Sequence, residues 1–246
     1  MAKFQHPPID SSKREIRVLQ PLSEQHLALD GQIGRPKPAN NVIVFPDLTL
    51  RFAIKVVSLD DKSPYTALSY VWGSDEAVRP ITLNGHTRLI TDNSYSALRH
   101  MQYADVAPAI WIDAICIDQA YDVEKTEQIK LMRSIYVGAT CVIVWLGLPT
   151  EDSAFISAVL DNFAKNIQRR FNVPTPLDDE LVEYLDFDSG SDVLDFLQSA
   201  IDPATSEGSE KVTSSKFVEI FFTFVTTVRW WYRTWVLQEF AFARNV

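Results

Sequence analysis

Cysteine and histidine are scarce in this 246-residue chain, which has two cysteines and four histidines. No cysteine stands in a CxxC or Cys/His spacing, and the histidines are single residues in tails, turns and a helix surface. We therefore expect no metal site and no Ser/His/Asp or Cys/His catalytic set. Cys116 and Cys141 lie in strand-like apolar runs, which favours two buried free thiols, with a disulfide as the alternative if the strands are adjacent.

Positive charge is also in deficit, because 23 Lys and Arg face 32 Asp and Glu, for a net charge of -9. This balance argues against a DNA partner or an anionic membrane surface, since both require a basic face. The N-terminus lacks the apolar core of a secretory signal. The most apolar late segment, FVEIFFTFVTTV, contains Glu219 and falls short of the roughly 20 apolar residues of a membrane helix. We expect a cytoplasmic protein without a membrane span.

The glycine motifs of common nucleotide and hydrolase sites are absent. There is no GxGxxG after a strand, no GxxxxGK[ST] and no GxSxG. These absences exclude a redox dinucleotide fold, a P-loop and the nucleophile elbow of α/β-hydrolases. We expect no resident cofactor.

The most informative segment that is present is IWIDAICIDQ, residues 110–119. Its composition is that of a fully buried strand, yet it contains Asp113 and ends with Asp118. Burying an unpaired carboxylate costs several kcal/mol, so such an acid needs a partner or a task. Asp113 either caps a neighbouring helix or pairs with an arginine, or it belongs to the crevice that open α/β sheets form at their strand ends.

The hydrophobic pattern predicts strands that alternate with helices. Strands are expected over residues 48–57, 66–72, 109–118 and 140–147, and Asn84-Gly85 marks a hairpin. Helices are expected over 94–102 and from Asp122 to about 138. This order predicts an α/β fold with a doubly wound, mainly parallel central sheet, an N-terminal strand/hairpin addition and a helical insertion.

The pattern also predicts how the chain is divided. Residues 1–40 are rich in proline and polar residues, and we expect an irregular arm in which SKREIRVLQPL is a candidate short strand. Residues 41–246 form the main domain, with 151–228 as a mainly helical insertion. In that insertion we expect helices at SAFISAVLDNFAKNIQRRF, DELVEYL, DVLDFLQSAI and KFVEIFFTFVTTV, and a last helix begins near Thr234.

The remaining candidates for chemistry are acidic and aromatic. Asp113, Asp118 and Glu239 are carboxylates in apolar surroundings, and Trp72 precedes Gly73 at the end of a predicted strand. Most aromatic residues at strand or helix spacing belong to a core. Glu239 has its own structural alternative, an ion pair with Arg233 or Arg229.

Four ordered motifs resemble those of the fungal heterokaryon-incompatibility (HET) domain. They are ALSYVWG (67–73), IWIDAICIDQ (110–119), EQIKLMRSIYVGATCVIVWLG (127–147) and RTWVLQEFAFA (233–243). The chain departs from the family in CIDQ, where Asn usually precedes Gln. It also has Glu-Lys at residues 124 and 125, where Glu-Arg is commoner in the family. The resemblance implies a module of a longer protein that triggers programmed cell death when genetically different fungal cells fuse.

HET domains are in turn similar to Toll/interleukin-1 receptor (TIR) domains, which implies a TIR/flavodoxin-like sheet. Trp235 and Glu239 fall on the Trp and Glu of the TIR Ser-x-Trp-Cys-x-x-Glu motif, while Arg233 replaces the Ser and Val236 the Cys. That Glu is required for NAD cleavage in enzymatic TIR domains, so the resemblance implies Glu239 as the catalytic residue. The substrate-binding candidates are Ser69, Tyr70, Trp72, Gly73, Asp113, Asp118, Arg233 and Trp235.

Cleavage of NAD suits a chain with few histidines. Rupture of the nicotinamide–ribose bond passes through an oxocarbenium-like state. Nicotinamide leaves as a neutral ring, so one carboxylate near the ribose can suffice without a general acid. NAD is then a substrate, and a homo-oligomer is the expected active form. The alternative is a non-enzymatic, self-associating signalling module whose motifs are core architecture.

Overall fold

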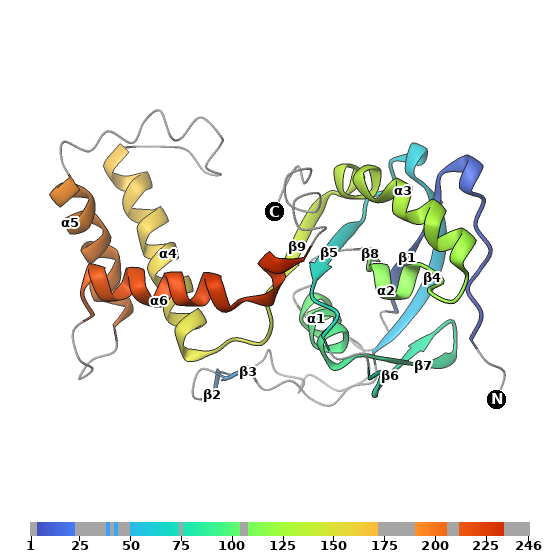
Figure 1. Cartoon of the computed structure of the whole chain (residues 1–246), viewed down its shortest axis with the longest axis horizontal. Coiled ribbons are helices and arrows are strands. Elements are labelled where there is room, and N and C mark those ends of the chain that lie inside the picture. The colour runs from blue at the N-terminus through green and yellow to red at the C-terminus, as the bar shows by residue number, and fades with distance from the viewer. Residues whose placement is uncertain are drawn as a thin grey trace. The chain divides into compact units, whose positions relative to one another are not determined.

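The computed structural model describes residues 4–22, 38–39, 42–43, 50–73, 76–103, 108–171, 190–205 and 212–233 (Figure 1). The chain divides into two compact units. The first comprises Met1–Leu148 and Arg229–Val246, and the second comprises Pro149–Val228.

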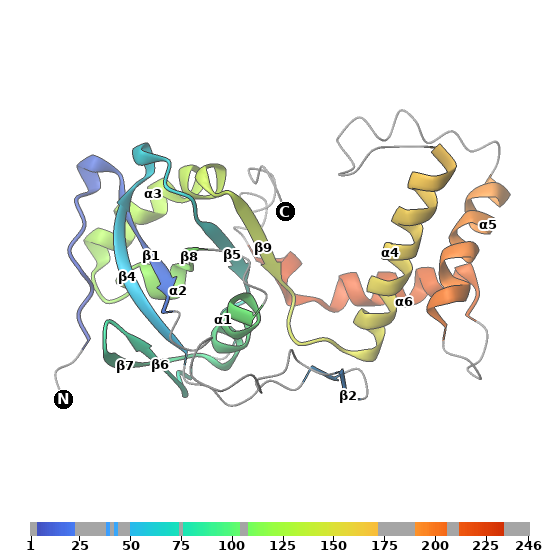
Figure 2. The same ribbon diagram turned by 180° about the vertical axis from the view of Figure 1, so that it is seen from behind.

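In the described part of the first unit, seven strands form one sheet in the order β7-β6-β4-β1-β8-β5-β9, seen from opposite sides in Figures 1 and 2. The strands are β1 (Glu15–Pro21), β4 (Arg51–Ser58), β5 (Thr66–Tyr70), β6 (Arg79–Leu83), β7 (His86–Ile90), β8 (Ile110–Trp111) and β9 (Cys141–Trp145). Parallel pairs join β4 to β6 and β5 to both β8 and β9. Antiparallel pairs join β1 to β4 and to β8, and β6 to β7. The α/β class is confirmed, but the sheet is mixed rather than mainly parallel.

The main cause of the difference is β1, which lies in the middle of the sheet between two antiparallel neighbours. Within β1, the side chains of Ile16, Val18 and Leu19 are fully or almost fully buried. Arg17 is also buried, and this charge interrupts the apolar run that would have identified a central strand. The candidate short strand in the N-terminal arm is thus a central strand. Outside the sheet, β2 (Pro38–Ala39) and β3 (Val42–Ile43) form a separate antiparallel pair.

The described first unit also has three α-helices, α1 (Asp92–Tyr103), α2 (Asp113–Cys116) and α3 (Asp122–Gly138), and short 3-10 turns at Ser11–Lys13, Leu59–Asp61 and Arg229–Tyr232. Buried residues of α1 and α3, among them Leu98 and Ile135, join the strands in one hydrophobic core. The predicted hairpin is confirmed, because Asn84 and Gly85 connect β6 to β7 with φ angles of 48° and 80°. Such a pair of positive angles is typical of the tight turns that match strand twist.

The prediction of one long strand across IWIDAICIDQ is wrong. The strand β8 covers only Ile110–Trp111, and the chain then turns into the single-turn helix α2. The amides of Ile115 and Cys116 both donate to the carbonyl of Ile112, which closes that turn. A short apolar run does not distinguish a buried strand from a buried helical turn.

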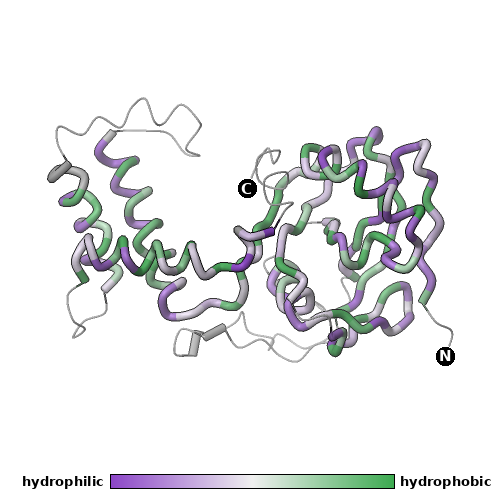
Figure 3. The backbone as a smooth tube through the Cα atoms, viewed as in Figure 1, coloured by the Kyte–Doolittle hydropathy of each residue, from purple (hydrophilic) through white to green (hydrophobic). Residues whose placement is uncertain are grey.

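The second unit is helical where it is described. Its helices are α4 (Glu151–Phe171), α5 (Gly190–Ile201) and α6 (Ser214–Thr227), and a short 3-10 turn (Asp202–Ala204) follows α5. Hydrophobic and hydrophilic residues alternate along α4 in Figure 3, as expected of an amphipathic helix. A small core joins these helices through Ile156, Val159, Ala200, Ile201 and Phe217. Three of the predicted helices are confirmed, while DELVEYL and the helix expected near Thr234 lie outside the described residues.

Two further expectations concern the cysteines and the membrane. Cys116 is buried and Cys141 half-buried, and both are free thiols, so the disulfide alternative is wrong. Burial raises the pKa of the Cys116 thiol to about 12, which makes it unreactive.

Within the described ranges, no helix is both long and apolar enough to cross a bilayer.

Candidate functional site

The candidate site lies at the carboxyl end of β5. All five residues of β5 are buried, and parallel neighbours β8 and β9 flank the strand. The carboxyl ends of parallel strands meet at one edge of a sheet, where ligands of open α/β folds bind. The residues directly after β5, Val71 to Gly73, therefore stand at the position where a site is expected.

Trp72 and Asp113 are joined by a hydrogen bond at this edge. The indole Nε1 of Trp72 donates to Oδ2 of Asp113 at 2.8 Å. The other carboxylate oxygen of Asp113 accepts from the backbone amide of Ala114 at 2.7 Å. Trp72 is 39% exposed, so part of the residue remains accessible at this edge. Asp113 is the first residue of α2 and does not cap a neighbouring helix through these two hydrogen bonds, and it also lines a cavity at the sheet edge.

A cavity of about 390 Å³ opens beside this pair. It is lined by Val71, Trp72, Gly73, Asp113, Ile117, Gln119, Lys125, Ile129, Met132 and Arg233. Its volume lies in the ~300–1,000 Å³ range of small-molecule sites. We call it the Trp72 pocket. Of the predicted site residues, Trp72, Gly73, Asp113 and Arg233 meet there.

The sequence analysis missed the contribution of α3 to this pocket. Lys125, Ile129 and Met132 stand four and three residues apart, and so present one face of the helix to the cavity. Gln119 comes from the turn before α3, and its amide donates to the backbone carbonyl of Asp113 at 3.0 Å. The available signal was the helical spacing of these residues within the helix predicted from Asp122 to about 138.

Ser69 and Tyr70 lie behind the pocket, because both are buried and neither lines the cavity. Ser69 accepts a hydrogen bond from the indole of Trp230 at 2.6 Å, and Tyr70 accepts one from Ser94 at 3.1 Å. Burial, assisted by the nearby Asp113 carboxylate, raises the pKa of the Tyr70 phenol well above its usual value. These two residues support the wall of the pocket.

Asp118 is directed elsewhere. Its carboxylate lies 3.5 Å from the His6 imidazole and accepts a hydrogen bond from the Ala120 amide, which is the pattern of a turn. It is absent from the lining of the Trp72 pocket. The other two predicted residues, Trp235 and Glu239, lie outside the described residues.

Asn93 fixes the turn after β5. Its amide nitrogen donates to the carbonyl of Val71, and its oxygen accepts from the indole of Trp145 at 2.9 Å. Gly73 has a φ of +83°, which glycine adopts without the cost that a side chain imposes. A Cβ on Gly73 would also lie 3.3 Å from the Cβ of Asn93. Glycine is therefore required at this corner of the pocket.

Basic side chains hold the opposite end of α2. Arg88 donates to the carbonyl of Ala114 at 3.2 Å, His6 lies 2.9 Å from that of Ile115, and Arg17 donates to that of Cys116 at 3.0 Å. They come from β7, the N-terminal segment and β1, so three separate parts of the chain position the helix that begins with Asp113. Without them the last carbonyls of this buried turn would lack partners.

Burial lowers the pKa of His6, and the nearby Arg88 and Arg17 add to this effect against the opposing influence of the Ile115 carbonyl and Asp118. His6 is therefore mainly neutral at neutral pH, and the site is held by two arginines and one uncharged imidazole.

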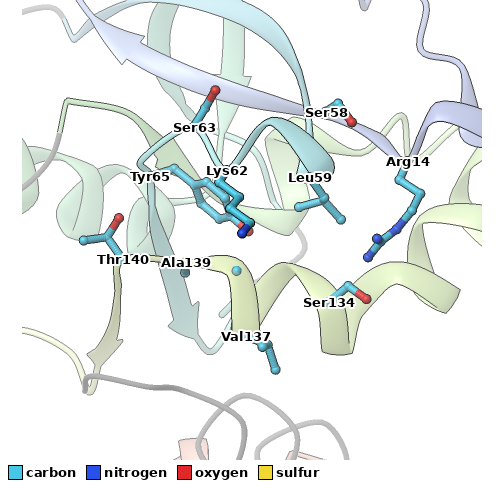
Figure 4. A pocket seen from close by; sticks show the side chains of 11 residues that line it. Arg14, Ser58, Leu59, Lys62, Ser63, Tyr65, Ser134, Val137, Ala139 and Thr140 are labelled. Carbon is cyan, nitrogen blue, oxygen red and sulfur yellow. The ribbon is translucent and has the colours of Figure 1, made fainter.

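A second cavity, of about 540 Å³, lies where β5 begins (Figure 4). Arg14, Lys62, Ser134 and Tyr65 are among its lining residues, and none of the predicted site residues is. The lining residues come from the connection between β4 and β5, from the last turn of α3 with the two residues after it, and from Arg14 just before β1. No group of three His, Cys, Asp or Glu side chains among the described residues is arranged to hold a metal ion.

Comparison with known proteins places the chain in a family. A family described as "Heterokaryon incompatibility protein (HET)" matches residues 65–239. The chain is similar to "Heterokaryon incompatibility protein 6, OR allele" of Neurospora crassa, with 35% identity over 114 residues, or 41% of the chain and 16% of that relative. The match thus spans about one sixth of the relative's length. No solved structure matches. Since the family match includes the Trp72 pocket and covers well over half of the sequence, the chain belongs to the heterokaryon incompatibility (HET) family.

Proposed function

We propose that this chain is the effector domain of a longer protein in fungal heterokaryon incompatibility, acting in the cytoplasm to trigger cell death. The family match and the name of the Neurospora crassa relative support this role. We further propose that the Trp72 pocket is where the domain acts. The observation that carries this is the exposed indole held against a fixed carboxylate beside an open cavity at the end of β5.

The proposed reaction is TIR-like hydrolysis of the nicotinamide–ribose bond of NAD. The bond from the ribose C1′ to the ring nitrogen breaks, and its electron pair goes to nicotinamide, which leaves as a neutral molecule. Water bonds to C1′ and releases a proton, so the products are nicotinamide, ADP-ribose and a proton. The transition state gathers positive charge on the ribose, and a nearby carboxylate stabilises that charge.

In this proposal the residues have separate tasks. Glu239 stabilises the ribose cation, Trp72 stacks on a ring of the substrate, and Asp113 orients the ribose through its hydroxyl groups. Asp113 already accepts from Trp72 and Ala114, so its carboxylate is fixed before substrate arrives. Such preorganisation avoids the cost of reorienting the group during the reaction.

A second function, a self-associating signalling module without catalysis, is favoured by the same two hydrogen bonds. They tie the end of β5 to the start of α2, which is what a purely structural aspartate would do. On this proposal the domain acts through partners or as a homo-oligomer, and the four sequence motifs serve to build its core.

Nicotinamide release from NAD by the pure chain tests the choice, measured by chromatography at high protein concentration because an oligomer is the expected active form. The variants are Glu239→Gln and Asp113→Asn, with Asp61→Asn as a control at an exposed acid outside the pocket. We expect release with wild type and Asp61→Asn, and a loss of at least tenfold in the other two. Cell killing by Glu239→Gln after its NAD cleavage is lost would refute the catalytic role and favour the signalling module.

A further inference from the structure

The adjacent residues Glu124 and Lys125, at the start of α3, have opposite environments. Glu124 is buried and forms a bidentate ion pair with Arg17, at 2.6 and 2.8 Å. It also accepts from the amide of Asp118 at 2.8 Å. Lys125 instead lines the Trp72 pocket. Glu124 is thus fully accounted for by the fold, and the role of Lys125 has to be sought in the pocket.

The polar groups of the pocket leave Lys125 available. Among the described residues that line the pocket there is one carboxylate, Asp113, whose two oxygens accept from Trp72 and Ala114. The lining contains two cations, Lys125 and Arg233, in a chain of net charge -9. Lys125 forms no ion pair with any residue in the described part of the chain. The described lining of the cavity thus carries more positive than negative side chains, although the chain as a whole is acidic.

Apart from Gln119, the other described side chains of the wall are apolar. Ile117, Ile129 and Met132 provide hydrophobic surface next to the exposed indole of Trp72. A flat ring fits between such groups, since stacking on an aromatic residue contributes about 1–3 kcal/mol per base. A lysine ammonium next to a ring-binding surface is suited to a phosphate, which it binds as a point charge.

We propose that Lys125 binds a phosphate group of the ligand, and that the Trp72 pocket selects nucleoside phosphates over nucleosides. This inference rests on the proposed function in that it concerns the same pocket, and it names the part of the ligand that Lys125 recognises. A single positive charge satisfies the requirement, so arginine, which the resemblance gives as the commoner residue at this position, serves equally well. The proposal does not depend on whether a bond is broken.

The test measures binding directly, by isothermal titration calorimetry of the whole chain with AMP and with adenosine. We expect wild type to bind AMP at least tenfold more tightly than adenosine. Lys125→Gln lowers AMP affinity about tenfold and leaves adenosine affinity unchanged, and Lys125→Arg restores the preference. Lys130→Gln is the matched control, because Lys130 is exposed on the same helix and pairs with Glu127 at 2.6 Å, away from the pocket.

Several results would overturn the proposal: no AMP binding by wild type, equal affinity for AMP and adenosine, unchanged AMP affinity in Lys125→Gln, or no recovery in Lys125→Arg. A thermal unfolding curve of Lys125→Gln that coincides with wild type establishes that the variant is folded. The proposed catalysis fails separately. A chain that selects AMP through Lys125 without releasing nicotinamide from NAD retains this inference and loses the enzymatic one.

Discussion

Replacing Glu124 with Gln should destabilise the first unit more than any substitution at an exposed acid. Glu124 and Arg17 are both buried, with 9% and 1% of their surfaces exposed. The Arg17 guanidinium binds both carboxylate oxygens and also donates to the carbonyls of Pro7 and Cys116. Gln keeps the shape of Glu but removes its charge, so the guanidinium remains buried without a counter-ion.

The size of the effect follows from this burial. Removing one partner of a buried ion pair costs about 3–5 kcal/mol, because an uncompensated charge remains. Native domains are stable by about 5–15 kcal/mol, so the loss is a large fraction of the total. Replacing both partners with apolar residues, as Arg17→Met with Glu124→Leu, should cost less than the sum of the single changes, since no charge is left behind.

Urea unfolding followed by tryptophan fluorescence is the appropriate assay. All six tryptophans fall in the sequence ranges of the first unit and none in Pro149–Val228, so the signal reports the unit that contains Glu124. A loss below about 1 kcal/mol in Glu124→Gln would refute the argument, because exposed ion pairs already contribute that much. A double variant as unstable as the two single changes combined would refute it as well.

The pH dependence provides a second check on the same pair. Burial opposes ionisation of Glu124, but the hydrogen bonds from Arg17 and the Asp118 amide outweigh it, and the pKa of Glu124 falls below its usual value. The stabilisation is therefore complete above the unfolded pKa of about 4.3 and is lost as the pH falls through the folded pKa. The stability of Glu124→Gln should change less than that of wild type over this acidic range.

Three further predictions concern the supports of the site. Because the folded pKa of His6 lies below its usual value, stability should fall as the pH drops below about 6.5, and melting temperatures of His6→Gln between pH 7.5 and 5 should fall less. Gly73→Ala and Gly85→Ala each place a side chain on a left-handed backbone, which costs about 1–2 kcal/mol of stability. Only Gly73→Ala adds a 3.3 Å contact with Asn93, so it should lose more stability than Gly85→Ala, and equal losses would contradict this. Trp72→Phe removes one donor to the pocket carboxylate and should cost about 1 kcal/mol in urea unfolding, and no loss would mean that the bond contributes nothing.

Much of the fold could be predicted where one face of an element is apolar and the other polar. The hairpin at Asn84-Gly85, the helix α4 and the strand β4 are examples, because periodicity and turn residues identify each one locally. The central position of β1 was not predictable in this way. Its buried Arg17 is tolerated only through Glu124, which lies 107 residues away in the sequence. A partner so distant leaves no local pattern.

The candidate site was predictable only in part, for a related reason. Trp72 was identifiable as an aromatic residue at the end of a predicted strand, and Asp113 was identifiable as an acid in an apolar run. Lys125 was not, since its relevance depends on α3 packing beside the end of β5. Asp118 was selected on the same evidence as Asp113, yet it serves a turn beside His6. Sequence identified which acids required an explanation, and the tertiary fold separated their roles.

The two roles of Asp113 can be separated by choosing its replacement. Asn has no charge and keeps one oxygen, which can accept from Trp72, but its NH2 group cannot accept from the Ala114 amide. Ala removes both acceptors, which leaves the indole Nε1 of Trp72 and the Ala114 amide without their partner. If the charge of Asp113 acts on a ligand, Asn should lower nicotinamide release at least tenfold while it costs less stability than Ala. If the aspartate is purely structural, Asn should cost less than Ala in both assays, and the loss of release should follow the loss of stability. Unfolding and NAD cleavage measured side by side on Asp113→Asn and Asp113→Ala therefore decide whether the acid in this apolar run builds the pocket or also works inside it.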